Sequence, residues 1–252
     1  MLPPRTTKEP YLSAISLFRT VSVPHQMRAY RFSSNHGGVT KILRLESDVK
    51  VPRPSEPKQT LVRVLTVSFN PVDHKSAETL LYHFALFKPN TPGADLVGEI
   101  VQGPSCCPYH KGDYVSGTAK NAFAGGMLAE YAIADMDRVV SLGRMSPGEG
   151  TAIAIAELIA VRSIISRVKP KSHIFINGGS GRTGTFEIQI AIAAGHTVTV
   201  SCSDRHAELR QSLREEIIDY TRETLLQDLK VAPSDSKFNL MVDNIYTDAE
   251  LF

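Results

Sequence analysis

The sequence predicts an α/β protein in which an N-terminal β domain is followed by a doubly wound parallel sheet with helices. Three observations predict this class. Residues 27–144 form short, β-branched segments with alternating apolar positions, separated by clusters of Gly, Pro, Asn and Asp, as in a β-barrel or sandwich. From about residue 146, apolar strands alternate with helices, which is typical of βαβ units. A glycine-rich segment at 178–184 joins the first of these strands to the helix that follows it.

The composition is that of an ordinary globular protein with room for a sizeable core. The 252 residues are 42% hydrophobic and 21% charged. Lys and Arg number 28 against 26 Asp and Glu, so neither a nucleic acid nor a membrane surface is an expected partner. Three Cys are too few for a disulfide scaffold and contain no CxxC pair for a structural zinc ion. The longest apolar stretch, 151–161, is too short to cross a bilayer.

Residues 1–26 are expected to form an N-terminal extension outside the folded part. They hold four prolines, with three basic residues against the single acid Glu9. This composition favours a disordered tail, and a mitochondrial presequence is the alternative because such segments are basic and poor in acids. The expected location is therefore cytoplasmic, with mitochondria as the alternative.

The β domain is expected to occupy residues 27–145. Its predicted strands are 27–32, 41–48, 60–69, 95–102, 113–119, 128–134 and 138–142.

The second domain is expected to occupy residues 146–252. Its predicted helices are 148–168, 183–194 and 207–216, and its predicted strands are 173–177, 196–203, 216–220 and 237–245. Strands that alternate with helices in this way build a parallel sheet.

The glycine-rich segment is the sharpest chemical signal in the sequence. It has the form G-x-G-x-x-G between a strand and a helix, which predicts binding of a dinucleotide. Gly179 allows a tight turn, Gly181 lets the backbone approach a pyrophosphate, and Gly184 lets the helix pack closely. The helix N-terminus presents free N–H groups to the anion. The predicted cofactor contacts in this segment are Gly179, Ser180, Gly181, Arg182, Thr183 and Gly184. A glycine-rich loop without a ligand is the alternative.

The end of the next strand predicts which dinucleotide binds. A carboxylate about 20 residues beyond the glycines selects NAD by binding the ribose hydroxyl. Here that region begins with Ser201 and Ser203, which leave room for a 2′-phosphate, and Arg205 is placed to pair with it. Asp204 argues against this, although Asp at such a position also caps a following helix. The sequence favours NADPH over NADH.

These motifs resemble those of the zinc-free medium-chain dehydrogenases/reductases, in the quinone-oxidoreductase-like and enoyl-reductase-like branch that includes zinc-type-alcohol-dehydrogenase-like proteins. The resemblance covers about residues 27–245. In the first half it rests on NPVDHK at 70–75, PGADLVG at 92–98, GDYV at 112–115 and AEY at 129–131. In the second half it rests on INGGSGRTGTFEIQIA at 176–191, TVTVSCSDRHAEL at 197–209, IIDYT at 217–221 and FNLMVDN at 238–244. The resemblance implies a GroES-like β-barrel followed by a Rossmann domain, with NADPH and substrate in the cleft between them.

The resemblance also implies that the chain works without zinc. Zinc-dependent relatives carry a His and then a Glu after the Pro-Gly motif, where this chain has Ala94 and Asp95. It also lacks the four closely spaced Cys of their structural zinc site, so we expect no metal.

The activity implied by the resemblance is hydride transfer from NADPH to an activated double bond in an enone, an enoyl thioester or a quinone. Such a reaction needs a hydrogen bond to the carbonyl oxygen and a proton for the α-carbon. By analogy with enoyl reductases, Tyr82 is the candidate proton donor, and packing of an amphipathic ring is its alternative role. Asn70 is the candidate hydrogen-bonding residue near nicotinamide or substrate, and a turn before Pro71 is its alternative role.

The chain also departs from the family pattern. The usual loop has Gly where this chain has Arg182, which either contacts phosphate or projects to solvent and is strained if the backbone there needs positive φ. Relatives also continue well beyond the equivalent of Phe252, so we expect a C-terminally truncated member with an incomplete Rossmann domain. Two hypotheses follow: a working NADPH-dependent reductase of a small molecule, with a homodimer left open, or an inactive relative that only binds nucleotide.

Overall fold

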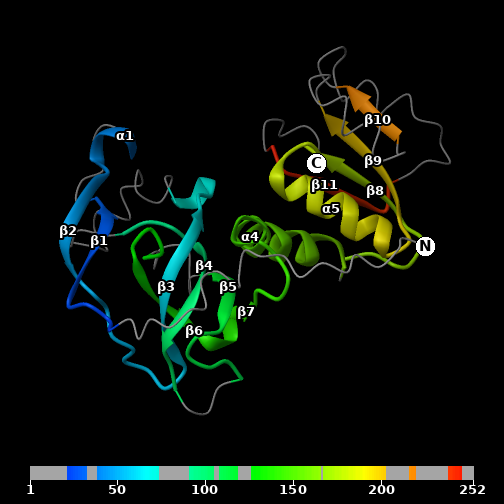
Figure 1. Cartoon of the computed structure of the whole chain (residues 1–252). Coiled ribbons are helices and arrows are strands. Elements are labelled where there is room, and N and C mark those ends of the chain that lie inside the picture. The colour runs from blue at the N-terminus through cyan, green and yellow to red at the C-terminus, as the bar shows by residue number, and fades with distance from the viewer. Residues whose placement is uncertain are drawn as a thin grey trace.

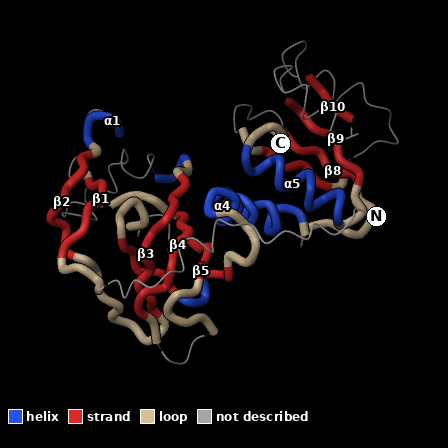
Figure 2. The backbone as a smooth tube through the Cα atoms, viewed as in Figure 1, coloured by secondary structure: helices blue, strands red, loops and turns tan. Residues whose placement is uncertain are grey.

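Helix α4 (Pro147–Ile164) lies between two sheets of different kinds (Figures 1 and 2). The computed structural model describes residues 22–32, 39–73, 91–104, 108–118, 126–165, 167–202, 216–219 and 238–245. The N-terminal part is antiparallel and the C-terminal part is parallel. This arrangement confirms the predicted fold class.

The N-terminal part is built on a five-stranded antiparallel sheet in the order β6-β3-β4-β5-β7. The strands are β3 (Gln59–Ser68), β4 (Asp95–Gln102), β5 (Tyr114–Thr118), β6 (Tyr131–Asp135) and β7 (Val139–Ser141), and the short helix η1 (Met136–Arg138) joins the last two. Strands β1 (Gln26–Arg31) and β2 (Arg44–Lys50) form a separate ribbon, with helix α1 (Val39–Ile42) before β2. An isolated bridge between Ala29 and Ala129 ties this ribbon to the loop before β6.

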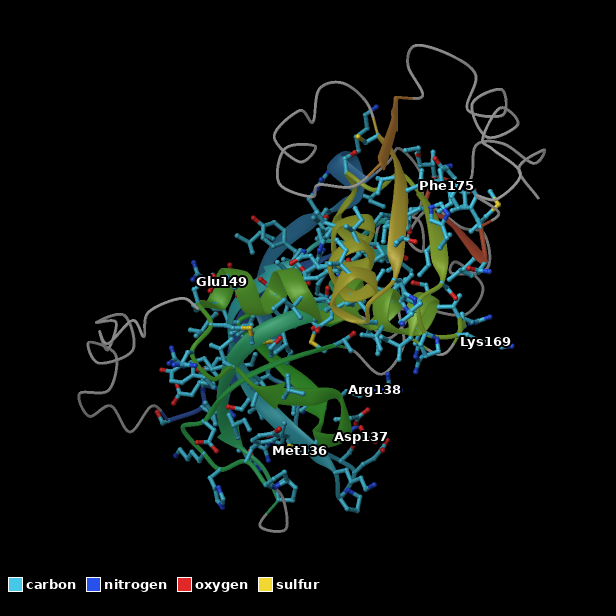
Figure 3. All side chains as sticks on the ribbon, turned by 90° about the vertical axis from the view of Figure 1, so that its right-hand side faces the viewer. Met136, Asp137, Arg138, Glu149, Lys169 and Phe175 are labelled. Carbon is cyan, nitrogen blue, oxygen red and sulfur yellow. The ribbon has the colours of Figure 1, made fainter. Side chains whose placement is uncertain are left out.

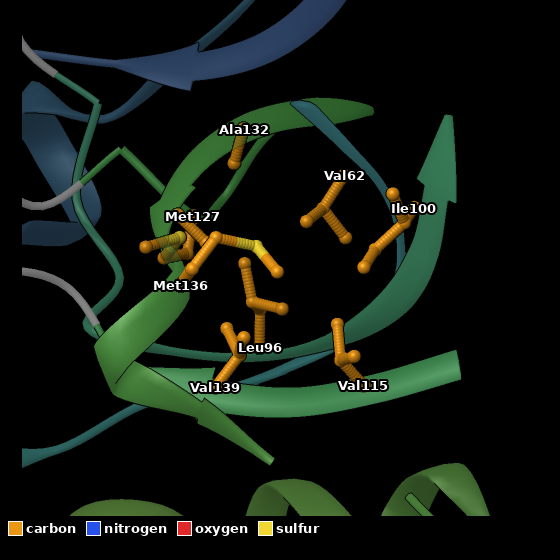
Figure 4. Close-up of a cluster of buried hydrophobic side chains, with 9 residues drawn as sticks. Val62, Leu96, Ile100, Val115, Met127, Ala132, Met136 and Val139 are labelled. Carbon is orange, nitrogen blue, oxygen red and sulfur yellow. The ribbon is translucent and has the colours of Figure 1, made fainter. Parts of the chain in front are cut away.

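Alternating apolar residues from these strands fill the interior of the β domain. Figure 4 shows side chains from β3, β4, β5 and β7 converging on one cluster. The cluster is formed by Val62, Leu96, Ile100, Val115, Met127, Ala132, Ala134, Met136 and Val139. This buried core fixes the ends of β3 and β4, which lead into the polar residues discussed below.

The C-terminal part is a four-stranded parallel sheet in the order β10-β9-β8-β11. Its strands are β8 (His173–Asn177), β9 (Thr197–Cys202), β10 (Glu216–Asp219) and β11 (Leu240–Asp243). Helix α5 (Arg182–Ala193) connects β8 to β9 and packs on both strands. In Figure 3 the side chain of Phe175, on β8, lies at this sheet, and its ring contacts that of Phe238.

The strand order reverses next to β8. The chain passes from β8 to β9 on one side, whereas β11 pairs with β8 on the other side. In open parallel sheets, ligands bind beyond the carboxyl ends of the strands at such a reversal. The topology therefore predicts a ligand site among the residues that follow β8 and β11.

Helix α4 begins with a complete capping box. The Ser146 hydroxyl accepts a hydrogen bond from the backbone N–H of Glu149, and the Glu149 carboxylate accepts one from the backbone N–H of Ser146. Pro147 at the first helical position lacks an N–H that would otherwise need a partner. The helix packs against β3, β4 and β5 on one side and against α5 on the other, so it couples the two sheets.

Most predicted elements appear with small shifts at their ends. The predicted strand 41–48 begins too early, because 39–42 form the short helix α1. The helix predicted at 148–168 ends at Ile164. The helix predicted at 207–216 lies outside the described residues except for its last residue, which begins β10.

We expect Ser146→Ala to lower the free energy of unfolding by about 1 kcal/mol, because the first turn of α4 loses its cap. Urea denaturation followed by far-UV circular dichroism measures this change. Glu157→Ala, at an exposed position in the same helix, is the matched control and is expected to change stability by about 0.5 kcal/mol or less. Equal stabilities of the two variants would contradict the assigned cap.

Candidate functional site

A cavity of about 710 Å³ opens at the carboxyl ends of β8 and β11, where the strand order reverses. Its walls come from the loop after β3, the middle of α4, the glycine-rich segment and the residues after β11. The lining residues are Phe69, Asn70, Pro71, Val72, Ile155, Ala156, Ile159, Gly178, Ser180, Gly181, Arg182, Thr183, Gly184, Asn244 and Ile245. The cavity thus brings together the predicted glycine-rich segment and the predicted Asn70.

The N-terminus of α5 is open toward this cavity. Gly181 is the N-cap residue and provides no side chain to bond the first turn. The first N–H that closes a helical hydrogen bond is that of Thr185, which donates to the Gly181 carbonyl. The backbone N–H groups of residues 182–184 therefore precede the first intrahelical bond, and together with the helix dipole they form a site suited to an anion.

Close packing explains the glycines of the loop. The left-handed conformation falls at Gly178 (φ 76°), one residue before the position predicted for the tight turn. A Cβ on Gly179 would lie 2.0 Å from a methyl of Val200, and one on Gly184 would lie 2.5 Å from the Gly178 carbonyl oxygen. A Cβ on Gly181 would lie 3.2 Å from that same oxygen. The loop is therefore pressed against β9 and folded over the start of α5.

Ser201 supports the loop from the protein interior. Its side chain is fully buried, and its hydroxyl donates to the Asn177 side-chain oxygen and accepts from the Gly178 N–H at 3.0 Å. Asn177 in turn donates to Asp243 on β11 at 2.8 Å. The structure thus places Ser201 beneath the loop. The predicted residues Ser203 and Arg205 lie outside the described residues.

Asn70 lies in a buried polar cluster at the end of β3. Its side-chain amide donates to Asp95 Oδ2 at 2.9 Å, and its backbone N–H donates to Asp73 Oδ2 at 2.6 Å. Burial raises the pKa of both carboxyl groups above the usual value for Asp, and hydrogen bonds from Asn70 partly oppose this. Asn70 is therefore held rigidly at the cavity wall. The predicted proton donor Tyr82 lies outside the described residues.

Arg182 extends from the glycine-rich segment toward this cluster. Its Nη1 donates to Asn70 Oδ1 at 3.1 Å, and its Nη2 lies 3.1 Å from the Ser68 hydroxyl and 3.5 Å from Asp95 Oδ2. The guanidinium also donates to backbone carbonyls at the start of α4, those of Thr151 and Ala152.

The side chain of Arg182 thus projects neither onto the loop nor freely into solvent. Lys171 is the only non-glycine residue with positive φ in the described part of the chain, so Arg182 is not strained in the way the sequence suggested.

Glu187 is a site residue that the sequence analysis missed. It is fully buried on α5, where it accepts hydrogen bonds from the Ser163 hydroxyl at 2.9 Å and from the Asn244 amide at 2.6 Å. Burial raises its pKa above the usual value for Glu. Because Asn244 lines the cavity, Glu187 fixes a cavity wall from inside the protein. The signal available in the sequence was a single acid among the apolar residues of α5.

The described residues contain no group of three or more His, Cys, Asp or Glu side chains arranged to hold a metal ion. Among the helices they form, none has the length and apolar character needed to cross a bilayer.

Comparison with known proteins gives matches over both parts of the chain. The family model for the alcohol dehydrogenase GroES-like domain matches residues 56–144. The trans-enoyl reductase pgmF of Aspergillus terreus (strain NIH 2624 / FGSC A1156) is 35% identical over 248 residues, which cover 92% of this chain and 68% of that protein. A chloroplastic quinone-oxidoreductase homolog of Spinacia oleracea is 30% identical over 77% of this chain and 61% of its own length.

A solved structure is also similar to this chain over both of its parts. The quinone oxidoreductase from Coxiella burnetii superposes with a TM-score of 0.71 at 27% identity, covering 81% of this chain and 65% of that one. The chain therefore spans about two thirds of the length of the relatives it matches.

We expect Glu187→Gln to flatten the dependence of stability on pH. Because its pKa is raised in the folded state, Glu187 adds stability below the usual carboxyl pKa, and this stability is lost as the pH rises through the raised value. A glutamine can still accept from Asn244 and donate to Ser163 but does not ionise. Urea unfolding between about pH 4 and pH 7 measures the difference.

The matched control is Glu157→Gln, which alters an exposed carboxyl group on α4. Identical pH profiles for wild type and Glu187→Gln would show that the ionisation of Glu187 does not contribute to stability.

Proposed function

Because the chain belongs to the medium-chain dehydrogenase/reductase family, in its quinone-oxidoreductase-like and enoyl-reductase-like branch, we propose that it is an NADPH-dependent reductase of activated double bonds. The substrate is an α,β-unsaturated carbonyl compound or a quinone, and the reaction needs no zinc. The observation that carries the proposal is the open N-terminus of α5, which faces a cavity shared with Asn70.

The residues present fit a dinucleotide. The backbone N–H groups of residues 182–184 would hold the pyrophosphate, and Gly181 leaves its backbone accessible because it has no side chain. NADPH supplies hydride when bound. We propose that Arg205 and Ser203 select it over NADH by contacting the 2′-phosphate, whereas Ser201 supports the loop through Asn177 and Gly178.

The remaining wall of the cavity suits an apolar substrate. Phe69, Val72, Ile155 and Ile159 line it, and Asn70 and Arg182 are the polar side chains on the β-domain side. An apolar pocket with a few directed polar groups is the usual form of a small-molecule site. The names of the trans-enoyl reductase and the quinone oxidoreductase support activated double bonds and quinones as the acceptor class. Tyr82 remains the proposed proton donor.

Zinc independence is supported by the side chains at 94 and 95. Ala94 offers no ligand, and Asp95 is hydrogen-bonded by Asn70 and faces the Arg182 guanidinium at 3.5 Å. A cation already placed against this carboxylate disfavours a second one.

The proposal is tested by titrating the purified chain with NADPH, followed by NADPH oxidation assays with trans-2-hexenal and 1,4-naphthoquinone. We expect saturable binding and turnover, and we expect Gly181→Val to abolish binding because its methyl groups cover the loop backbone. Gly148→Val is the matched control, since a Cβ there meets no atom within 4 Å at the start of α4. Its affinity should equal that of wild type.

The outcomes separate the two functional hypotheses. Binding without turnover would favour a relative that only binds nucleotide, and unaltered affinity of Gly181→Val would refute the phosphate site. No binding to folded protein would refute the proposal as a whole.

We expect Arg205→Ala to narrow the preference for NADPH over NADH, because the variant loses the proposed partner of the 2′-phosphate. The ratio of the two dissociation constants, measured by fluorescence titration, is the readout. It should fall by about tenfold, since hydrogen bonds to charged groups contribute about 1.5–3 kcal/mol. Arg210→Ala is the basic-residue control. An unchanged ratio in Arg205→Ala would remove the basis for NADPH selection.

A further inference from the structure

We propose that Arg182 is a catalytic residue whose guanidinium binds the carbonyl oxygen of the substrate and stabilises the negative charge that develops there. This inference rests on the proposed function and names the electrophilic group of the same site. Neither the resemblance nor the comparisons supply this residue, because the usual family loop has glycine at this position.

The contacts of Arg182 separate its side chain from the phosphate site. Among the described residues, the acceptors of its guanidinium all lie in the β domain or in α4: Ser68, Asn70, Asp95, Thr151 and Ala152. None lies in the glycine-rich segment from which the side chain starts. The backbone N–H of residue 182 therefore belongs to the proposed phosphate site, whereas the guanidinium lies beside Asn70.

One N–H group of the Arg182 guanidinium remains for a ligand. A guanidinium has five N–H groups. The Nε–H bonds Ala152, the Nη2 group has several acceptors at 2.9–3.5 Å, and one Nη1–H bonds Asn70. The second Nη1–H has no acceptor among the described residues. Arg182 lines the cavity and its side chain is 33% exposed, and we infer that this donor reaches a bound molecule.

The guanidinium is positioned before any substrate arrives. Asp95 is fully buried, and the carbonyls at the start of α4 are fixed by the helix, so the acceptors do not need to reorganise. Donors held in place around a developing charge stabilise it more effectively than mobile donors or water. The Asp95 contact is made by Nη2, so it leaves the second Nη1–H for a ligand.

The chemistry of the reaction requires such a group. The hydride would come from NADPH, which would lose a C–H bond and be oxidised to NADP+. When this hydride adds to the β-carbon of an enone, a new C–H bond forms, the carbon–carbon π bond breaks, and its electrons move through the conjugated system onto the carbonyl oxygen. The resulting enolate oxygen is negative and accepts the free Nη1–H of Arg182. Protonation of the α-carbon, from Tyr82 or water, then restores the carbonyl and releases the saturated product. The guanidinium acts in this step only as a hydrogen-bond donor.

The first test measures anion binding without turnover, using 4-nitrophenol as a probe with an aromatic oxyanion. The site should bind the phenolate in preference to the phenol, so the bound probe should ionise at a pH about 1 lower than the free probe. The absorbance of the phenolate during a pH titration with excess protein reports this. Arg182→Gln should abolish the effect. Arg162→Gln, which alters an exposed arginine on α4, should preserve it.

The second test compares turnover with stability. Arg182→Gln should lower kcat by about 100-fold or more, the cost of losing one oxyanion donor, while NADPH affinity is retained because the backbone N–H remains. Because this variant leaves Asp95 buried without its cation, the double variant Arg182→Gln/Asp95→Asn removes the unpaired charge. The double variant should regain thermal stability but not activity. Arg182→Lys keeps the positive charge but lacks the planar guanidinium group with its fixed donors. Its kcat should therefore lie between those of Arg182→Gln and wild type.

Recovery of wild-type turnover by the stabilised double variant would reduce Arg182 to a structural residue and overturn the inference. Failure of wild type to shift the ionisation of 4-nitrophenol would also overturn it. If wild type binds NADPH but reduces neither acceptor, while phenolate binding still depends on Arg182, then the proposed reaction fails and the oxyanion site stands.

Discussion

The Arg182 guanidinium connects the parts of the molecule that form the cavity. Its side chain starts at the first residue of α5 and donates to the carbonyl groups of Thr151 and Ala152 in α4. It also reaches Asn70 and Asp95 in the β domain. Asn70 and Asp95 are 112 and 87 residues away from Arg182 in the sequence. A buried carboxylate is costly unless it is paired or hydrogen-bonded, so Asp95 and the guanidinium depend on each other. The same contacts that join the two sheets therefore also fix the polar wall of the site.

A second polar network holds the opposite wall. Glu187 joins α4 to the residue after β11 through Ser163 and Asn244, and Ser201 joins β9 to the glycine-rich segment. Both side chains are fully buried, and every bond named here ends at a cavity-lining residue or at the helix behind it. The parallel sheet supplies the apolar support for these bonds through Ile174, Ile176, Val198 and Val200. Polar side chains inside the protein thus determine the shape of the cavity as much as those on its surface do.

Patterns that act over short distances in sequence gave the most reliable predictions. The strand β8 coincides with the predicted range 173–177, and α5 begins one residue before the predicted helix, because a strand, a glycine turn and an apolar helix follow one another directly. The family resemblance is confirmed by the matching relatives. The sequence predicts that Ser201 contacts the cofactor, but no local pattern showed that its hydroxyl also supports the loop. Its burial beneath Gly178 depends on the packing of β9 against β8.

Hydrophobic periodicity and backbone preferences are local properties, so they were enough to predict the two kinds of sheet, the order of their elements and the glycine-rich start of a helix. The sequence also predicted a role for Asn70 near the nicotinamide or substrate and a separate role for Arg182 in binding the cofactor. The contact between these two side chains, at 3.1 Å, is visible only in the folded protein. The reason is physical: their 112-residue separation is closed by the packing of α4 between the antiparallel sheet and α5, and no local pattern encodes where a long arginine side chain finds its acceptors.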